Sequence, residues 1–302
     1  MNKIVVIAGP TASGKSRIGV DLARKFNGEI ISCDSMQVYK YMDIGTAKIT
    51  QEEMQGIPHH MISVADPLKD YSVGEYAKAA EIAIKDVISR GKVPFIVGGS
   101  GLYIDSILYP LTFGSNKNNS IRLELQRELE ENGAEYMHAK LAAIDPKDAE
   151  KIHPNNTKRV LRALEIYQVT GNCKSEMKED VKPMKYDCLM IALDIDREEL
   201  YCNINNRVDK MMQDGLLDEI SKLNTMGIVF SKQSMQAIGY KEFENYFNGT
   251  ISIDDTVEII KKNTRNYAKR QITWLKRYKF AKWLSPKEVE EIVNSVSMFL
   301  NE

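Results

Sequence analysis

The first half of the chain alternates short runs of apolar residues with segments in which apolar residues recur every three or four positions. The apolar runs predict buried strands at Ile4–Ala8, Glu29–Cys33, Val93–Val97 and, much later, Cys188–Leu193. The periodic segments predict amphipathic helices at Ser16–Phe26 and Gly74–Arg90. Strands that alternate with helices imply right-handed crossovers and a parallel sheet, so the pattern predicts an α/β fold.

The pattern changes between Thr112 and about Lys182, where helical periodicity continues and almost no strand is predicted. A polar loop at Gly114–Ser120 is typical of a domain boundary. Helices are predicted at Ile121–Leu141 with a break at Asn132-Gly133, after an N-cap at Asp145, and from about Asn156 to Gly171. We therefore expect an α/β core (first part) over 1–112, a helical insertion domain over 113–182, and a return to the core with a helical C-terminal region over 183–302.

Composition excludes several classes of protein. The chain has 302 residues, of which 43% are hydrophobic and 27% charged, values typical of a folded globular protein and not of a disordered or collagen-like one. No apolar run approaches the roughly 18–20 residues that cross a bilayer, and the apolar run at the amino end is too short for a signal peptide. The four cysteines are far apart without a C-x-x-C pair, so we expect free thiols and a cytoplasmic protein.

A phosphate-binding loop stands between the first strand and the first helix. Residues 9–16 match G-x-x-x-x-G-K-[ST] in the strand–loop–helix context that this motif requires. Backbone N–H groups and the helix N-terminus can hold a di- or triphosphate, Lys15 adds positive charge, and the Ser16 hydroxyl can bind Mg²⁺. This phosphate-binding loop does not identify the rest of the ligand, and ATP is only the default assumption for it. The predicted phosphate-binding residues are Gly9, Pro10, Thr11, Ala12, Ser13, Gly14, Lys15 and Ser16.

The carboxylate that kinases and ATPases place near such a loop is missing from its usual position. Those enzymes usually hold Mg²⁺ with an Asp at the end of a later apolar strand, whereas Val93–Val97 runs into Gly98-Gly99-Ser100. The nearest acid at a strand end is Asp34, after the second strand. Its carboxylate could serve Mg²⁺, accept a proton or cap a helix.

A concentrated positive segment runs from Lys261 to Lys282, and we expect one helix there. It contains nine Lys and Arg residues and no acid, in a chain whose formal net charge is −1. It could bind a nucleic-acid backbone, with Lys269 and Arg270 as candidate contacts, or form a solvated face whose aromatic residues pack into the core. The role of a second cluster at Lys158–Arg162 has two equally compatible interpretations, because Arg162 could contact RNA or pair with Glu165.

Together these segments resemble the tRNA dimethylallyltransferase (tRNA isopentenyltransferase) family. The matching segments extend through most of the chain: Gly9–Ser16, Asp34–Tyr39, Asp43–Lys48, Pro58–Met61, Gly98–Tyr103, Ile152–Asn155, Arg159–Glu165, Arg207–Asp209, Gln236–Glu242 and Thr264–Gln271. So many ordered matches are far more specific than the phosphate loop alone. The sequence departs from the family pattern at Ser100, where threonine is usual, and at Tyr41, where glycine is common.

The resemblance implies a P-loop core with a helical insertion, and transfer of a dimethylallyl group from dimethylallyl diphosphate to N6 of the adenosine just 3′ of the anticodon of tRNA. It implies that Asp34 is the base, that Lys15, Ser16 with Mg²⁺, and Arg207 stabilise the diphosphate, and that Ser100 steers the adenine or the diphosphate. The expected tRNA contacts are Asp34, Ser35, Met36, Gln37, Ser100, Lys158, Arg159, Val160, Leu161 and Arg162, together with Lys269 and Arg270. We expect a monomer.

Two other functions are compatible with a phosphate loop. The first is a small-molecule kinase that uses ATP, which the missing strand-end acid and the basic segment disfavour. The second is an RNA-binding protein in which the loop acts as a nucleotide-dependent switch. Release of diphosphate from dimethylallyl diphosphate in the presence of tRNA separates prenyl transfer from both.

Overall fold

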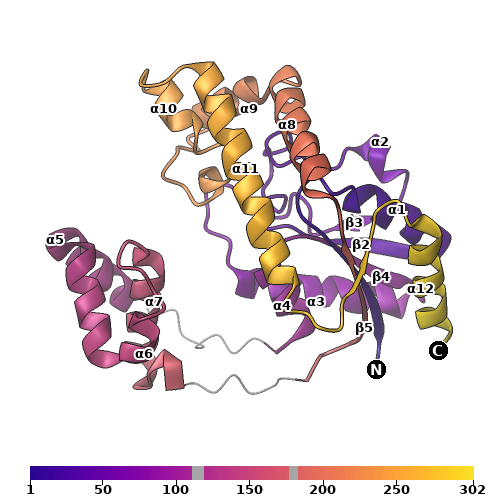
Figure 1. The fold of residues 1–302 in the computed structure, drawn as a ribbon, viewed down its shortest axis with the longest axis horizontal. Helices are drawn as coiled ribbons and strands as arrows, with labels where there is room; N and C mark the ends of the chain where they lie inside the picture. The colour runs from indigo at the N-terminus through magenta and orange to yellow at the C-terminus, as the bar shows by residue number, and fades with distance from the viewer. Residues whose placement is uncertain (111–118, 177–182) are drawn as a thin grey trace. The chain divides into compact units, whose positions relative to one another are not determined.

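The computed structural model describes residues 1–110, 119–176 and 183–302, which belong to two compact units. The core unit comprises Met1–Tyr109 and Met184–Glu302, and the insertion unit comprises Pro110–Pro183 (Figure 1). The boundaries that we expected at residues 113 and 182, and most of the polar loop at Gly114–Ser120, lie outside the described residues.

Within the described residues of the core unit, six strands form one parallel sheet. Their order in space is β3 (His59–His60), β2 (Gly28–Cys33), β4 (Val93–Gly98), β1 (Lys3–Ala8), β5 (Asp187–Leu193) and β6 (Lys282–Leu284). The four predicted strands and the α/β class are confirmed. The strands β3 and β6 were not predicted, because elements of two or three residues carry no readable periodicity.

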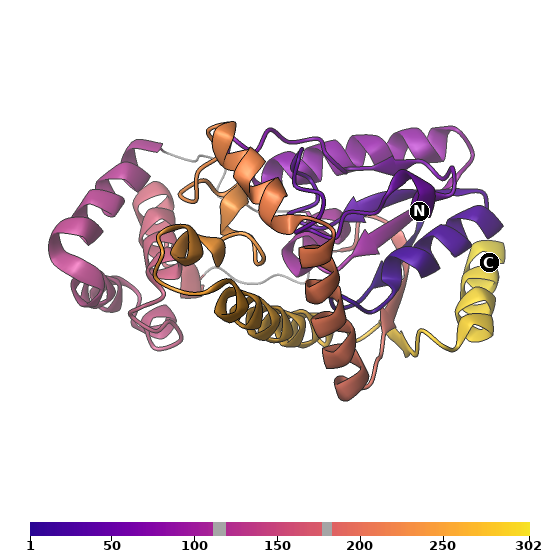
Figure 2. The same cartoon turned by 90° about the horizontal axis from the view of Figure 1, so that it is seen from above.

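Helices cover both faces of the sheet, and successive side chains of β1 pack against the helices on opposite faces. Val6 packs in the same apolar cluster as α3 (Val73–Ser89), whereas the next residue, Ile7, packs with α1 (Lys15–Lys25) and α12 (Val289–Asn301). The two layers are visible on opposite sides of the strands in Figure 2. Because successive side chains of a strand point to opposite faces, an uninterrupted apolar run is needed when both faces are covered. Each fully buried side chain of this size contributes about 1.5–3 kcal/mol.

The other helices of the core unit follow the strands. They are α2 (Gln51–Met54), α4 (Gly101–Leu108), α8 (Arg197–Gln213), α9 (Leu216–Thr225), α10 (Phe243–Phe247), α11 (Ile253–Leu275) and the 3₁₀ turn Ser234–Gln236. The single helix expected through Lys282 was wrong at its end, because α11 stops at Leu275. The buried Tyr278 hydroxyl donates to Asp105 Oδ1 at 2.6 Å, and Lys282 then begins β6, so tertiary contacts override local helical preference.

The insertion unit is helical where it is described. It contains α5 (Asn119–Ile144), α6 (Pro146–Ala149), α7 (Thr157–Thr170) and a 3₁₀ turn at Lys174–Glu176, and its described part has no strand. The predicted break is confirmed, since Gly133 has φ of 82° inside α5. The predicted cap is also confirmed, because Asp145 accepts a hydrogen bond from the Asp148 N–H. Among the described residues of both units, no helix is long and apolar enough to cross a membrane.

Glu29, in β2, is a buried carboxylate surrounded by three basic side chains. It is 1% exposed and binds Arg90 through both of its oxygens, Lys92 at 2.8 Å and the His60 ring at 2.7 Å. A buried charge is tolerated only when it is paired. Hydrogen bonds from Arg90, opposed by burial and reinforced by Lys92 and His60, hold the pKa of Glu29 well below its ordinary value of 4.5.

Replacing Glu29 with glutamine is expected to lower the free energy of unfolding by about 2 kcal/mol at pH 7. Arg90, Lys92 and His60 would lose the buried anion that they bind, but they are partly exposed and can be solvated instead. Since the folded-state pKa of Glu29 is depressed, its contribution is present above the ordinary value of 4.5 and is lost as pH falls below it. Urea titrations of both proteins at pH 7 and about pH 3.5 measure this. A stability difference that does not shrink at the lower pH contradicts it.

Candidate active site

The phosphate loop has the backbone conformation of an anion-binding cradle. It joins the end of β1 to the start of α1, and its backbone turns left-handed at Ala12 (φ 63°) and at Gly14 (φ 82°). Among the described residues, the N–H groups of Gly14, Lys15 and Ser16 find no acceptor. Alternating left-handed residues and the free N–H groups of a helix N-terminus together favour a bound phosphate.

Lys15 and Arg207 bring positive charge to this loop from two elements. The Lys15 ammonium donates to the Pro10 carbonyl at 3.1 Å, and the Arg207 guanidinium, from α8, donates to Thr11 Oγ1 at 3.4 Å. Burial, followed by the charge of Arg207, lowers the pKa of Lys15 to about 8, while Asp34 opposes the shift. Burial also lowers the pKa of Arg207. Two partly desolvated cations beside one loop are suited to a multiply charged anion.

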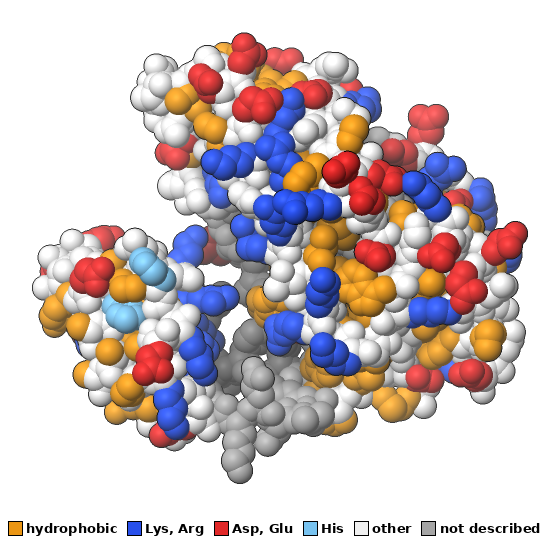
Figure 3. All heavy atoms as spheres, viewed as in Figure 1, with side chains coloured by type: hydrophobic (Ala, Val, Ile, Leu, Met, Phe, Trp, Pro, Cys, Tyr) orange, Lys and Arg blue, Asp and Glu red, His pale blue; other side chains and the backbone are white. Residues whose placement is uncertain are grey.

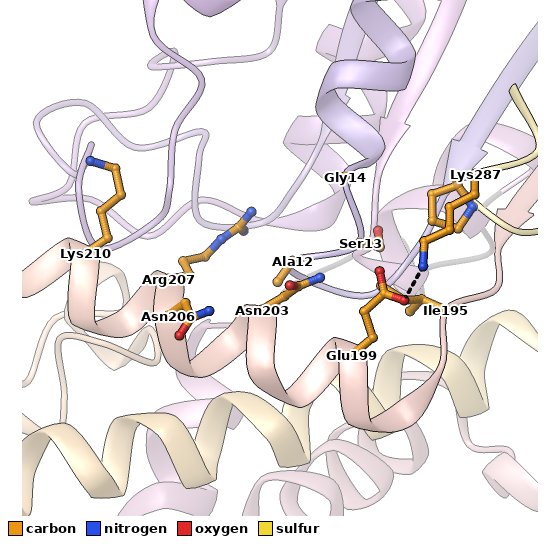
Figure 4. Close-up of a pocket in the computed structure, with 11 residues that line it drawn as sticks. Ala12, Ser13, Gly14, Ile195, Glu199, Asn203, Asn206, Arg207, Lys210 and Lys287 are labelled. Atoms are coloured by element: carbon orange, nitrogen blue, oxygen red, sulfur yellow. Dashed lines mark hydrogen bonds and ion pairs between the residues drawn. The ribbon is translucent and has the colours of Figure 1, made fainter.

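A cavity of about 510 Å³ opens beside the loop. One wall is residues 12–14 of the phosphate loop, and the opposite wall is the polar side of α8, which includes Asn203 and Asn206. Figure 4 shows Arg207 and Asn203 projecting from α8 toward the loop. The Ser13 hydroxyl is buried without a hydrogen-bond partner in this wall. A buried polar atom without a partner is energetically unfavourable.

Asp34 follows β2 and uses its two carboxylate oxygens differently. Oδ1 accepts from the N–H of Met36 at 2.9 Å and of Gln37 at 3.3 Å, which closes a turn. Oδ2 accepts no hydrogen bond from any described residue. Capping and proton acceptance are therefore compatible roles, because one oxygen shapes the loop and the other is available to a substrate.

Ser100 fixes the loop that carries Asp34. Its hydroxyl accepts from the Ser35 N–H at 3.0 Å and donates to Ser35 Oγ at 3.3 Å. Tyr267, from α11, lies near Asp34 and Ser100. Burial and then the charge of Asp34 raise the pKa of Tyr267 to about 12, whereas the hydrogen bond with the Ser100 hydroxyl acts in the opposite direction. Tyr267 was not among the predicted site residues, although it lies in the matched segment Thr264–Gln271.

The Gln37 amide, which we expected to contact the substrate base, is engaged within the protein. Its Nε2 donates to the carbonyl oxygens of Thr46 and Ala47, both at 3.2 Å, and its Oε1 accepts from Ser32. In this arrangement the amide shapes the loop below Asp34. Met36 is half-buried against the main apolar cluster, the one that contains Val6 and the buried face of α3, so it too supports the loop.

The matched segment Asp43–Lys48 also has a structural role. Glu219, from α9, accepts the N–H groups of Asp43, Ile44 and Gly45 at 2.8–3.1 Å. Just before it, Tyr41 has φ of 66°, the left-handed region that glycine adopts without steric cost. This explains why glycine suits that position in the family pattern.

The predicted RNA-contacting cluster of α7 divides into exposed and buried side chains. Lys158 and Arg159 are exposed, whereas Val160 is fully buried in the insertion unit's own core and Leu161 packs against it. Arg162 pairs with Glu165 at 2.9 Å, which is the structural alternative considered from the sequence. Lys158 and Arg159 therefore present exposed side chains to a partner, whereas the guanidinium of Arg162 is held by Glu165.

Exposed cations gather on the core unit over α8, α11 and the segment after α11 (Figure 3). The exposed members of the predicted basic segment are Lys262, Lys269, Arg270, Lys276, Arg277, Lys279 and Lys282. Three of them lie over aromatic rings: Lys269 over Tyr201 at 5.9 Å, Arg270 over Tyr267 at 5.7 Å and Arg277 over Trp274 at 4.7 Å. Trp274 itself packs against the main apolar cluster, so it is mainly a core residue.

Gln271 is a second residue of this site, after Tyr267, that was not predicted from the sequence. It is 4% exposed on α11, accepts the Thr11 N–H at 2.8 Å and donates to the Gly99 carbonyl at 3.0 Å. The Thr11 N–H is thus committed to Gln271 and not to a phosphate. Only the position of Gln271 in a matched segment could have signalled it, because its partners are about 170 and 260 residues away in sequence.

The donors around the loop fit Mg²⁺ bound together with a diphosphate. Among the described residues, no group of three His, Cys, Asp or Glu side chains could hold a metal by itself. Mg²⁺ at phosphate sites is held largely by phosphate oxygens and water, and needs only one or two protein oxygens. The exposed Ser16 hydroxyl in the first turn of α1 is such an oxygen.

Comparison with known proteins gives consistent matches over the whole chain. A family model described as IPP transferase matches residues 37–278. A tRNA dimethylallyltransferase of Caldanaerobacter subterraneus subsp. tengcongensis is 50% identical over 306 residues, which cover 99% of this chain and 97% of that protein. A tRNA dimethylallyltransferase of Bacillus subtilis is 49% identical, over 93% of this chain and 90% of that protein.

Solved structures are similar in fold as well as in sequence. The tRNA delta(2)-isopentenylpyrophosphate transferase of Staphylococcus epidermidis is 45% identical with a TM-score of 0.73, and covers 100% of this chain and 99% of its own. A eukaryotic dimethylallyltransferase acting on tRNA is 33% identical with a TM-score of 0.82, over 99% of this chain and 77% of its own.

Proposed function

The chain belongs to the IPP transferase family, and from this premise we propose that it transfers a dimethylallyl group from dimethylallyl diphosphate to N6 of the adenosine 3′-adjacent to the anticodon of a tRNA, releasing diphosphate. One observation carries the proposal at the level of chemistry. A cationic phosphate cradle and a carboxylate with a free oxygen, Asp34, belong to one site, since the charge of Asp34 acts on both Lys15 and Arg207.

The cradle supports the departure of diphosphate. As the allylic C–O bond breaks, negative charge grows on the leaving diphosphate. The free N–H groups of the loop, with Lys15 and Arg207, lie where they can stabilise that charge in a partly desolvated site. They would therefore bind the transition state, in which the diphosphate carries more negative charge, more strongly than the ground-state donor.

Asp34 supports the attack of the amine. The N6 lone pair of adenine is delocalised into the ring, so the amine is a poor nucleophile. We propose that Oδ2 of Asp34 accepts an N6 proton while N6 forms the new bond to the allylic carbon and diphosphate takes the electrons of the C–O bond. Oδ1 remains bonded to the N–H groups of Met36 and Gln37, which keeps the carboxylate oriented.

Mg²⁺ is part of the proposal. The Ser16 hydroxyl would hold it, and the ion would supply positive charge to the diphosphate oxygens. Ser16 lies one residue after Lys15, so both groups reach the same end of α1.

The exposed cations of α11 and the following turn form the proposed tRNA-binding surface of the core unit. Neutralising the four residues Lys269, Arg270, Lys276 and Arg277 together should make the salt dependence of tRNA affinity less steep, by about three to four in the slope of log K against log salt. Filter binding at several salt concentrations measures the slope. As a matched control, neutralising the exposed Lys25, Lys78 and Lys85 of α1 and α3 should leave it unchanged. An unchanged slope in the first variant would make the basic surface structural.

The proposed function is tested by incubating the protein with unmodified tRNA, Mg²⁺ and labelled dimethylallyl diphosphate, followed by nucleoside analysis. Label in N6-isopentenyladenosine and an equal amount of released diphosphate are expected. Consumption of ATP without transfer of label would identify a kinase, and RNA binding without modification would identify a switch. The proposal also includes a monomeric state and a cytoplasmic location, which light scattering and cell fractionation check.

A further inference from the structure

One buried side chain connects the two halves of the site. Gln271, on α11, accepts the N–H of Thr11 in the phosphate loop and donates to the carbonyl of Gly99. Both halves of its amide are therefore used, and both partners are backbone groups of loops that follow strands β1 and β4. A side chain with this pattern fixes the distance between two loops, because a shift of one loop relative to the other breaks at least one of the two bonds.

The connection continues from Gly99 to Asp34. The next residue, Ser100, accepts the N–H of Ser35, which adjoins Asp34. In the same helix, Tyr267 lies one turn before Gln271 and is near Asp34, as the effect of that carboxylate on its pKa indicates. A continuous path thus runs from the diphosphate cradle through Gln271 to the carboxylate.

The packing around Gly99 leaves no room for a side chain at that position. A Cβ at Gly99 would collide with Gln271 Nε2 and with the carbonyl oxygen of Gly9. The Gly9 N–H also donates to the Gly98 carbonyl at 3.3 Å. Glycine at position 99 is therefore required by the close approach of the amide, and the contact is built into the site.

We propose that Gln271 is a positioning residue: it holds the phosphate loop and the Asp34 loop at the separation that the transfer requires, without touching either substrate. This rests on the proposed function and adds a residue to it. Since Lys269 and Arg270 are exposed on the same turn, the helix that would contact tRNA is also the helix that sets this separation.

The test replaces Gln271 with methionine, which keeps the length of the side chain and removes both hydrogen bonds, and with glutamate, which keeps only the acceptor for Thr11. At saturating tRNA and dimethylallyl diphosphate, the single-turnover rate should fall about 100-fold in Q271M, since a misplacement of about 1 Å costs that much. It should fall at least tenfold in Q271E. KM for dimethylallyl diphosphate and Kd for tRNA should change less than threefold.

The control is Thr256→Val, a buried hydrogen-bonding residue of the same helix about 22 Å along its axis from Gln271. It should lower the melting temperature without lowering the rate at saturation. The inference is overturned if Q271M keeps the parental rate within twofold, if only its KM changes, or if T256V loses rate to the same extent. Should Q271M fail to fold, Q271E decides by the same criteria. A parent protein that transfers no label would instead overturn the proposed function.

Discussion

Replacing Asp34 with asparagine is expected to lower turnover by about two to four powers of ten while tRNA affinity stays within a few-fold of the parent. Asparagine keeps an oxygen that can accept from the Met36 and Gln37 N–H groups, so the turn is preserved. Its amide nitrogen cannot accept a proton from N6. The loss should therefore appear in the rate of the chemical step and not in binding. Single-turnover measurements at saturating substrates, together with filter binding of tRNA, separate the two.

Asp34→Ala provides the matched comparison. It removes the proton acceptor and also the oxygen that closes the turn, so it should lose similar activity and some thermal stability in addition. If the proton acceptor is the main contribution, the two variants will differ in melting temperature more than in rate. Turnover in Asp34→Asn within threefold of the parent would exclude Asp34 as the base.

Four of the six described strands and six of the twelve described α-helices could be predicted, because their signals are local. An apolar run such as Ile4–Ala8 predicts a strand and an amphipathic repeat such as Gly74–Arg90 predicts a helix, and the structure has β1 and α3 at these positions. The end of α11 could not be predicted, because it depends on Tyr278 reaching Asp105, 173 residues away. The edge strand β6 could not be predicted for the same reason, because it forms by pairing with β5, which is distant in sequence.

The site divides in the same way. The phosphate loop is a contiguous motif, so its residues and its cradle follow from sequence alone. Asp34 and Arg207 were assigned through family resemblance, and the structure places both within electrostatic reach of Lys15. Gln271 contacts two backbone groups, and no spacing rule relates a glutamine to them. Similarly, Gln37 has the chemistry of a base-reading residue, and only its contacts with Thr46 and Ala47 show that its amide is already used.

Lys15 should contribute strongly to binding of the prenyl donor, and its contribution should depend on pH. Replacing Lys15 with methionine removes the ammonium and keeps most of the aliphatic stem, so we expect Kd for dimethylallyl diphosphate to rise about 30- to 100-fold, the value of a hydrogen bond between charged groups. Turnover should fall together with binding, because the same ammonium faces the charge that grows on the leaving group. An unchanged Kd in this variant would contradict the assignment of Lys15 to the diphosphate.

The sign of the pH effect follows from the lowered pKa of Lys15, about 8 in the free protein. Only the protonated ammonium attracts diphosphate, and a bound anion raises the pKa of Lys15 above that value. Below about pH 8 the free protein already carries the charge, whereas above it binding must be accompanied by proton uptake, so affinity should fall by up to about tenfold per pH unit. The lysine-to-methionine variant corrects for ionisation of the ligand itself, since it keeps every other group. Isothermal titration calorimetry between about pH 7 and pH 9.5 should therefore show proton uptake and a steep loss of affinity in the parent, and a shallower loss in the variant. If affinity falls equally with pH in both proteins, the protonation of Lys15 is not coupled to diphosphate binding.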